Sequence, residues 1–259
     1  MLKFSANLTM MFTHIANPLD RIQAAADAGF GAVEFIFVYD MPMEELSAAI
    51  DKAAVQSSIV NIAVGEGVSM GPLVAAAPGK EEAFQENLEA AKKYCRRLQP
   101  VGMVVPAFTP PKGVSQADAM PVFKENMKRA ADELGDIGIK VLIEALNPGI
   151  RPNSILTTTE DVKAVLDEIN HPNLGIEYDA FHMYVTEGNM IETIERHLNL
   201  IGNIQIADAP NRGEPGSGEI DYDAFLTALD RMGYENWVAC EYEPTGETLA
   251  TLGWMDGWK

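Results

Sequence analysis

Short apolar segments rich in β-branched residues alternate along this chain with longer amphipathic segments. The apolar segments have the length and composition of strands that are buried on both faces of a sheet. Eight of them stand out, at residues 3–7, 32–37, 58–63, 101–106, 140–144, 174–179, 203–207 and 237–241. The amphipathic segments predict helices at residues 18–28, 42–55, 80–98, 115–137, 159–169, 189–200 and 222–232.

This alternation predicts the fold class. Strands that alternate with helices build right-handed βαβ units, and eight such units close into an α/β structure, the (β/α)8 TIM barrel. Gly29 and Gly233 follow two of the helices where a left-handed residue ends a helix, and the run Thr157-Thr158-Thr159-Glu160 offers a capped helix start. Because neither a linker nor a low-complexity tract divides the chain, we expect residues 1–259 to form a single domain.

Composition indicates a large hydrophobic core and argues against a membrane protein. The chain has 259 residues, of which 47% are hydrophobic, enough for a substantial core. It contains neither the roughly 20-residue apolar run of a membrane span nor an N-terminal signal segment, so we expect a cytoplasmic protein with no membrane partner. Cys95 and Cys240 lack zinc or redox spacing and are expected to be reduced packing residues.

The charge of the chain argues against two classes of partner. A formal net charge of −19 opposes binding to nucleic acid or to anionic lipid, since both need a basic surface. We therefore expect no nucleic acid partner and a small molecule as the ligand. A homo-oligomer is compatible with the sequence, which does not fix the oligomeric state.

Four polar side chains end consecutive predicted strands. They are Glu144, Asp179, Gln205 and Glu241. The carboxyl ends of barrel strands collect catalytic groups, and carboxylate and amide oxygens are hard ligands that suit Mg²⁺ or Mn²⁺. Any one of them alone is explained equally well as a solvated carboxylate or amide at a strand end. The four together favour a divalent metal site.

Three further residues near these strand ends are candidates for polar roles. His182, three residues after Asp179, could contact a substrate oxygen or support a ligand, and the alternative is a buried histidine bonded to backbone. Glu177 should lie in a deeper layer of the barrel, hydrogen-bonded or partly protonated, and is left out of the metal set. His14 is a weaker candidate in the loop after the first strand.

Three connections are longer than plain turns and leave predicted strand ends on the same face of the barrel. They are residues 64–79, 146–158 and 208–221. Loops at this face carry function in barrel enzymes. The third, which is rich in glycine and proline and contains Arg212, is expected to fold over the barrel mouth.

Several motifs, in this order and spacing, resemble the hydroxypyruvate isomerase family. They are NLTMMF at residues 7–12, AVEFIF at 32–37, IEALNPG at 143–149, YDAFH at 178–182, the segment 197–207 ending in GNIQIA, RGEPGSGEIDY at 212–222 and GWMDGW at 253–258. The resemblance runs almost end to end. It is closest to the bacterial 2-oxotetronate isomerase branch, within the xylose-isomerase-like TIM-barrel superfamily.

The resemblance implies an aldose–ketose type isomerisation of a small 2-oxo acid, 2-oxotetronate or hydroxypyruvate, without an organic cofactor. It implies that Glu144 and Glu241 form the proton donor and acceptor pair and also face the metal. A divalent ion would stabilise an enediolate while a carboxylate moves the proton between adjacent carbons. Arg212 would bind the substrate carboxylate through its planar fork, and its alternative role is a loop ion pair with Glu214.

Metal-dependent ketose 3-epimerases of the same superfamily are the nearest alternative. They typically carry histidine where this chain has Gln205, and a second glutamate where it has Ile150, so both departures favour an isomerase of acids. A barrel endonuclease would need more histidines and a basic track, whereas this chain has four histidines and is acidic. A non-catalytic binding protein would not need the pair Glu144 and Glu241.

Overall fold

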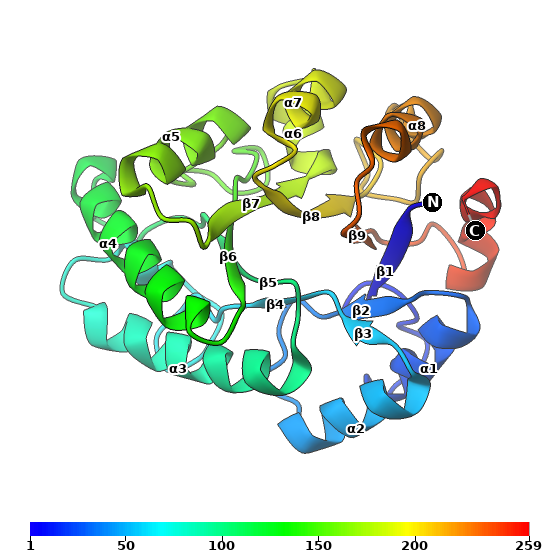
Figure 1. Ribbon diagram of the computed structural model, residues 1–259, viewed down its shortest axis with the longest axis horizontal. Coiled ribbons are helices and arrows are strands. Elements are labelled where there is room, and N and C mark those ends of the chain that lie inside the picture. The colour runs from blue at the N-terminus through cyan, green and yellow to red at the C-terminus, as the bar shows by residue number, and fades with distance from the viewer. Residues whose placement is uncertain (259) are drawn as a thin grey trace.

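The computed structural model describes residues 1–258 and shows parallel strands enclosed by helices (Figure 1). The strands are β1 Lys3–Asn7, β2 Ala32–Glu34, β3 Gln56–Ser57, β4 Ile59–Asn61, β5 Gly102–Pro106, β6 Lys140–Glu144, β7 Leu174–Asp179, β8 Ile201–Ile206 and β9 Trp237–Cys240. They form one sheet in the order β3-β2-β1-β9-β8-β7-β6-β5-β4, and every pair is parallel. The predicted barrel is confirmed.

The predicted third strand is divided at Ser58 into β3 and β4. β3 pairs with β2 and β4 pairs with β5, so the two short strands stand at opposite ends of the strand order. Ser58 joins them, because its N–H donates to the Val33 carbonyl at 3.0 Å and its carbonyl accepts from the Val101 N–H at 2.9 Å. The two segments therefore occupy one of eight barrel positions and bring the edges of the sheet together.

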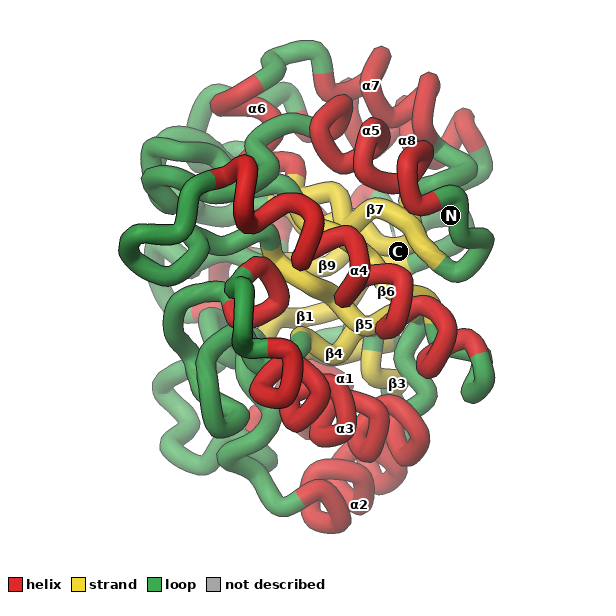
Figure 2. Tube along the Cα trace, turned by 90° about the vertical axis from the view of Figure 1, so that its left-hand side faces the viewer, coloured by secondary structure: helices red, strands yellow, loops and turns green. Residues whose placement is uncertain are grey.

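The helices follow the predicted alternation, with one addition. They are α1 Asp20–Asp27, α2 Met43–Ala53, α3 Glu81–Leu98, α4 Gln116–Gly135, α5 Thr159–Ile169, α6 Ala180–Thr186, α7 Met190–His197 and α8 Tyr222–Met232. Figure 2 shows them outside the strands, with the longer loops gathered at one end of the barrel. No helix within residues 1–258 combines the length and apolar composition needed to cross a bilayer.

The additional helix, α6, was not predicted because it begins directly after β7 without a loop between them. Its cap is Asp179, whose Oδ1 accepts from the backbone N–H of Phe181 at 2.8 Å and of His182 at 3.1 Å. One carboxylate oxygen thus satisfies two N–H groups that the first turn leaves free. This cap fixes Asp179 and His182 relative to each other.

Local chemistry sets the ends of the elements largely as expected. Thr158 and Asp161 form a reciprocal capping box at the start of α5, and Gly29 and Gly233 adopt φ values of 95° and 73° after α1 and α8. β2 is shorter than predicted and ends at Glu34. The chain leaves the ladder there because the Ile36 N–H donates to Thr9 Oγ1 at 3.0 Å instead.

Leu142 fills part of the barrel interior between three glycines. It lies two residues before Glu144 in β6 and so shares its face. A Cβ built on Gly102, Gly175 or Gly202 would lie 2.7, 3.0 or 2.4 Å from the Leu142 side chain. These glycines on β5, β7 and β8 therefore leave the space that the leucine occupies.

We predict that Gly202→Ala destabilises the protein, since the added methyl would overlap a fully buried leucine. Overpacking of this kind typically costs about 1–3 kcal/mol of unfolding free energy. Urea denaturation followed by circular dichroism measures the change. Gly246→Ala is the matched control, because a Cβ there meets nothing within 4 Å; equal midpoints for the two variants would contradict the packing described.

Candidate functional site

A cavity of about 120 Å³ opens at the carboxyl ends of the strands. Five of the six site residues expected from the sequence line it, namely Glu144, His182, Gln205, Arg212 and Glu241. The sixth, Asp179, lies beside it in contact with His182 and Arg212. A larger cavity of about 520 Å³, between residues 109–116 and 153–155, has no carboxylate, histidine or cysteine among its lining residues within the described chain. The smaller cavity is therefore the candidate site.

All three long loops contribute to the walls of this cavity. Val64 and Met70 come from the first, Ile150 and Arg151 from the second, and Arg212 from the third. Arg212 on the cavity wall agrees with the expectation that the third loop folds over the barrel mouth. A site with charged groups at its base and loop side chains at its rim can select substrates by size and charge.

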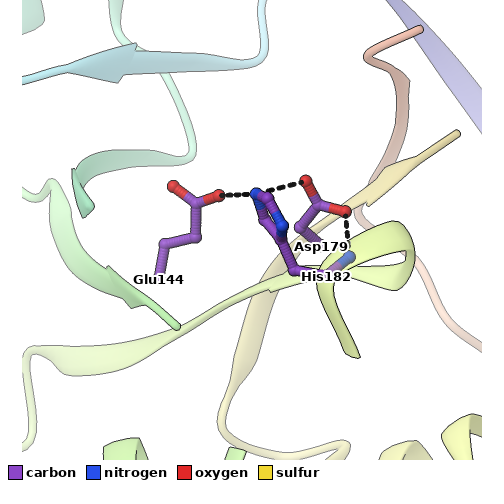
Figure 3. A group of neighbouring side chains, drawn as sticks. All are labelled: Glu144, Asp179 and His182. Carbon is purple, nitrogen blue, oxygen red and sulfur yellow. Dashed lines mark hydrogen bonds and ion pairs between the residues drawn. The ribbon is translucent and has the colours of Figure 1, made fainter. Parts of the chain in front are cut away.

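Glu144, Asp179 and His182 converge at the ends of β6 and β7 and on the first turn of α6 (Figure 3). His182 Nε2 lies 3.5 Å from Asp179 Oδ2 and 3.9 Å from Glu144 Oε1. All three side chains are buried, and each offers one ligand atom within 4.8 Å of the others. The two carboxylates of this cluster could contribute oxygen ligands to a metal ion.

Asn147 fixes the protonation state of His182. The Ile150 N–H donates to Asn147 Oδ1 at 3.0 Å, so the amide nitrogen faces His182 Nδ1, 2.7 Å away. Nδ1 accepts this bond, and the ring hydrogen is therefore on Nε2, where it faces the carboxylates. Burial lowers the pKa of His182 and favours this neutral form. The ring is thus bonded to side chains, and the alternative of a backbone-bonded histidine is wrong.

Arg212 approaches the same carboxylates from the third loop. Its Nη2 donates to Asp179 Oδ2 at 3.2 Å and to Glu241 Oε2 at 2.5 Å, and its guanidinium lies 5.2 Å from the centre of the Phe181 ring. The alternative ion pair with Glu214 is wrong, because the Glu214 carboxylate accepts from Thr245 instead. Arg212 supplies positive charge to a site crowded with acids.

Glu144 and Glu241 are buried carboxyls whose pKa values are both raised. Burial, followed by the charges of Glu241 and Asp179, raises the pKa of Glu144 well above its ordinary value. Burial raises the pKa of Glu241 to about 8, although the Arg212 charge opposes this shift. A carboxyl with a raised pKa keeps its proton more readily and is a stronger base once it has lost it, which suits both groups to proton transfer.

Gln205 presents an unused acceptor to the site. Its Nε2 donates to Glu34 Oε1 at 3.0 Å, and its buried Oε1 has no hydrogen-bond partner within residues 1–258. A buried acceptor without a partner is costly unless a ligand satisfies it. Together with the oxygens of Glu144, Asp179 and Glu241 it makes a hard donor set, so these residues fit a divalent cation.

Glu34 and Asn7 belong to the site but were not predicted as functional residues. The Glu34 carboxylate accepts from Gln205, from Asn7 Nδ2 at 3.2 Å and from Ser58 Oγ at 2.8 Å. Asn7 Nδ2 also donates to Glu241 Oε1 at 3.2 Å. The signal in the sequence was an acid within the apolar run AVEFIF, inside a strand expected to be buried on both faces.

The remaining expectations for polar and sulfur side chains agree with the structure. Glu177 is buried below the cavity, where Asn203 Nδ2 donates to it at 2.7 Å and burial raises its pKa well above the ordinary value. His14 is exposed and does not line the cavity. Cys95 and Cys240 are buried free thiols.

Comparison with known proteins gives a consistent set of relatives. The model of the xylose isomerase-like TIM-barrel family matches residues 22–258. The chain is 37% identical to hydroxypyruvate isomerase of Escherichia coli over 259 residues, with 100% of both chains covered. It is 35% identical to 2-oxo-tetronate isomerase of Haemophilus influenzae over 258 residues, with 99% of each chain covered. A crystal structure from Brucella melitensis described as AP endonuclease, family 2, superposes with a TM-score of 0.93 at 30% identity, with 100% of both chains covered.

We predict that Arg212→Met lowers the unfolding free energy, and more at pH 9 than at pH 6. Because the pKa of Glu241 in the folded protein, about 8, exceeds its ordinary 4.5, the stability contributed by this group falls as pH rises between these values. Removing the Arg212 cation raises the pKa of Glu241 further, so the unfolding free energy decreases more as the pH rises. At pH 9 we expect a loss of about 2 kcal/mol, less than for a fully buried pair, since the Arg212 side chain is 22% exposed.

Urea denaturation at the two pH values measures this loss. Arg151→Met is the control, because the Arg151 guanidinium forms no hydrogen bond or ion pair within the described residues. A loss for Arg212→Met that is equal at both pH values would mean that Arg212 does not balance the buried carboxylates.

Proposed function

This chain belongs to the xylose isomerase-like TIM-barrel family, and we propose that it is an isomerase of small 2-oxo acids. The reaction would interconvert the aldose-type and ketose-type forms of 2-oxotetronate or hydroxypyruvate through an enediolate, without an organic cofactor. The observation that carries this proposal is the pair Glu144 and Glu241, two buried carboxyls with raised pKa values on one small cavity. Full-length relatives named as isomerases of these two acids support it.

Glu144 and Glu241 would carry the proton between adjacent substrate carbons. The charged form of one removes a proton from the carbon that bears the hydroxyl group, which gives the enediolate, and the protonated form of the other returns a proton to the neighbouring carbon. The proton of the substrate hydroxyl moves to the former carbonyl oxygen, so the hydroxyl and carbonyl groups exchange places. Burial raises the pKa of Glu144 well above its ordinary value and that of Glu241 to about 8, so Glu241 has both forms accessible near neutral pH. At about 120 Å³ the cavity is small compared with the 300–1,000 Å³ of typical ligand pockets, which suits a substrate of few carbons.

His182 and Arg212 would contact substrate oxygens. His182 Nε2 carries a hydrogen that points toward the carboxylate cluster, where a substrate hydroxyl or carbonyl oxygen could accept it. Arg212 lines the same cavity and contributes a positive charge beside Asp179 and Glu241. Both groups would favour the negative charge that develops on the substrate.

Glu144, Asp179, Gln205 and Glu241 would hold Mg²⁺ or Mn²⁺. The partnerless Gln205 Oε1 and the convergence of the Glu144 and Asp179 carboxylates support this set. Glu241 is brought toward Asp179 by Arg212, whose Nη2 donates to both carboxylates. A bound divalent ion would supply charge that stabilises the enediolate, an effect worth several kcal/mol. Glu34 would act as a positioning residue, because its bond with Gln205 Nε2 leaves Oε1 free for the ion.

Two other functions fit the site less well. A ketose 3-epimerase of the same superfamily is the nearer one, but Gln205 and Ile150 stand where such enzymes typically carry histidine and glutamate. An endonuclease is suggested by the name of the Brucella melitensis structure alone. A net charge of −19 opposes binding to DNA, which depends on neutralising phosphates.

A cytoplasmic location stays a prediction.

We predict that Glu144→Gln and Glu241→Gln each fold but lose at least about a hundredfold in turnover, because an amide cannot exchange the proton. Proton NMR with hydroxypyruvate and both enantiomers of 2-oxotetronate follows the reaction. The control is Glu243→Gln, an exposed glutamate two residues from Glu241. Near-native turnover in either test variant would exclude that residue from acid–base catalysis.

We also predict that Gln205→Leu weakens Mn²⁺ binding by at least about tenfold. Loss of a residue that only hydrogen-bonds to a metal ligand typically costs about tenfold or more in affinity, and loss of a ligand itself should cost at least as much. Electron paramagnetic resonance of free Mn²⁺ gives the affinity without an activity assay. Gln23→Leu, which changes an exposed glutamine on α1, is the control. Equal affinity for both variants would remove Gln205 from the ligand set.

A further inference from the structure

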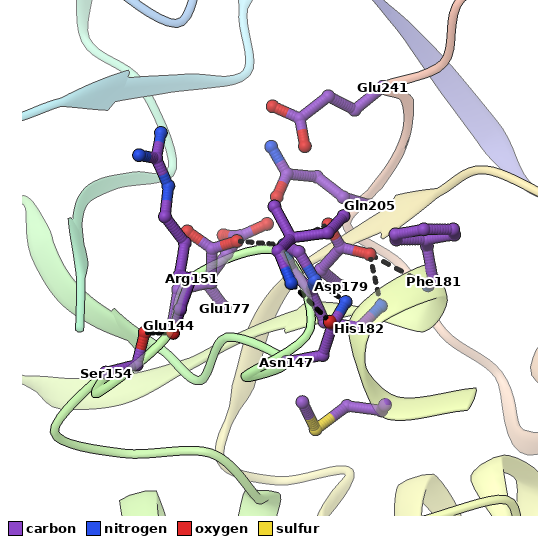
Figure 4. A network of polar contacts seen from close by, with 12 residues as sticks. Glu144, Asn147, Arg151, Ser154, Glu177, Asp179, Phe181, His182, Gln205 and Glu241 are labelled. Atoms are coloured by element: carbon purple, nitrogen blue, oxygen red, sulfur yellow. Dashed lines mark hydrogen bonds and ion pairs between the residues drawn. The ribbon is translucent and has the colours of Figure 1, made fainter. Parts of the chain in front are cut away.

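Arg151 lies on the wall of the candidate site, and its guanidinium has no hydrogen-bond or ion-pair partner among the described residues. It lies in the loop after β6 and is exposed at the rim of the cavity that Glu144 and Glu241 line. Within residues 1–258 its guanidinium forms no hydrogen bond or ion pair, and Figure 4 draws no contact from it to the neighbouring side chains. All five of its N–H donors are therefore free to bind a ligand.

The position of Arg151 is nevertheless defined. Its guanidinium stacks over the Phe108 ring at 4.3 Å. Its backbone N–H donates to the Asn147 carbonyl at 3.0 Å, and its carbonyl accepts from Ser154 Oγ at 2.9 Å. The same Asn147 orients His182, so one turn fixes the Arg151 backbone and the His182 ring together. An anion bound by Arg151 would therefore lie at a fixed position relative to His182 and the base of the site.

The two arginines of the cavity differ in what they can offer a substrate. Arg212 already donates to Asp179 and Glu241. The base of the site also concentrates acids, with Glu34, Glu144, Asp179 and Glu241 all buried there. A substrate carboxylate placed among them would be repelled, since like charges at short range in a poorly solvated site interact strongly. The rim, where Arg151 lies, is the favourable place for it.

We propose that Arg151 binds the terminal carboxylate of the substrate and thereby selects small acids over neutral sugars. This inference rests on the proposed function and specifies how the substrate lies. The carboxylate faces the rim in a fork-to-fork contact with Arg151, and the carbonyl and hydroxyl carbons extend toward Glu144 and Glu241. Met70 and Ile150, each 46% exposed, also line the cavity and would cover the short carbon chain.

Three variants test the proposal kinetically, with Mn²⁺ present. Arg151→Gln should raise the KM for the 2-oxo acid by about tenfold to a hundredfold, the usual effect of losing a charge-assisted bond, and leave kcat nearly unchanged. Arg151→Lys should recover part of the loss, because an ammonium group cannot form the fork. Lys112→Gln is the matched control, since Lys112 is a rim cation on the neighbouring cavity and forms no ion pair within the described chain. If Arg151→Gln behaves as Lys112→Gln does, the proposal is wrong.

Calorimetry with two inert probes separates this proposal from the proposed function. Threonate is a four-carbon hydroxy acid that cannot isomerise in this way, and threitol is its neutral counterpart. We expect the unsubstituted protein to bind threonate more tightly than threitol and Arg151→Gln to lose that preference. If this occurs without turnover of either oxo acid, the isomerase assignment fails and the carboxylate site stands. If the unsubstituted protein shows no preference for threonate, Arg151 is not a carboxylate receptor.

Discussion

The central physical constraint in this protein is the burial of several carboxyl groups at one end of a barrel. Glu34, Glu144, Asp179 and Glu241 are each less than 8% exposed, and an isolated buried carboxylate would cost several kcal/mol. The structure offsets this cost by three means: the Arg212 guanidinium, hydrogen bonds from Asn7, Ser58 and Gln205, and raised pKa values that let some carboxyls keep a proton. The surrounding loops and strand ends supply the charge and the hydrogen bonds that offset this cost.

The same constraint links stability to chemistry. A carboxyl that is held partly protonated near neutral pH is costly for folding but useful for moving protons. The third long loop crosses the mouth to bring Arg212 to the acids, and Arg212 adopts a left-handed backbone with φ of 57°, a conformation unfavourable for a side chain of this kind. The contacts of Arg212 with Asp179 and Glu241 offset the free-energy cost of this backbone conformation.

Patterns along the sequence predicted the barrel, most of the helices and the six residues that the structure brings together, of which five line one cavity and Asp179 lies beside it. Alternation sufficed because each strand is buried on both faces and each helix on one. Glu34 and Asn7 were missed because their importance comes from bonds across the barrel, to Gln205 and Glu241, which are far from them in sequence. Arg151 and Asn147 were missed because a loop turn, which has no hydrophobic periodicity, sets their positions.

The most direct test of this account is an infrared titration of the metal-free protein that compares the unsubstituted chain with Glu241→Gln. The difference spectrum isolates the carboxyl group of Glu241 from the other buried acids. The account predicts a protonated-carboxyl C=O band below neutral pH that disappears as the pH rises through about 8, together with a changed titration of Glu144 in the variant. A Glu241 carboxyl that is fully ionised at pH 6 would contradict the raised pKa on which the proposed chemistry depends.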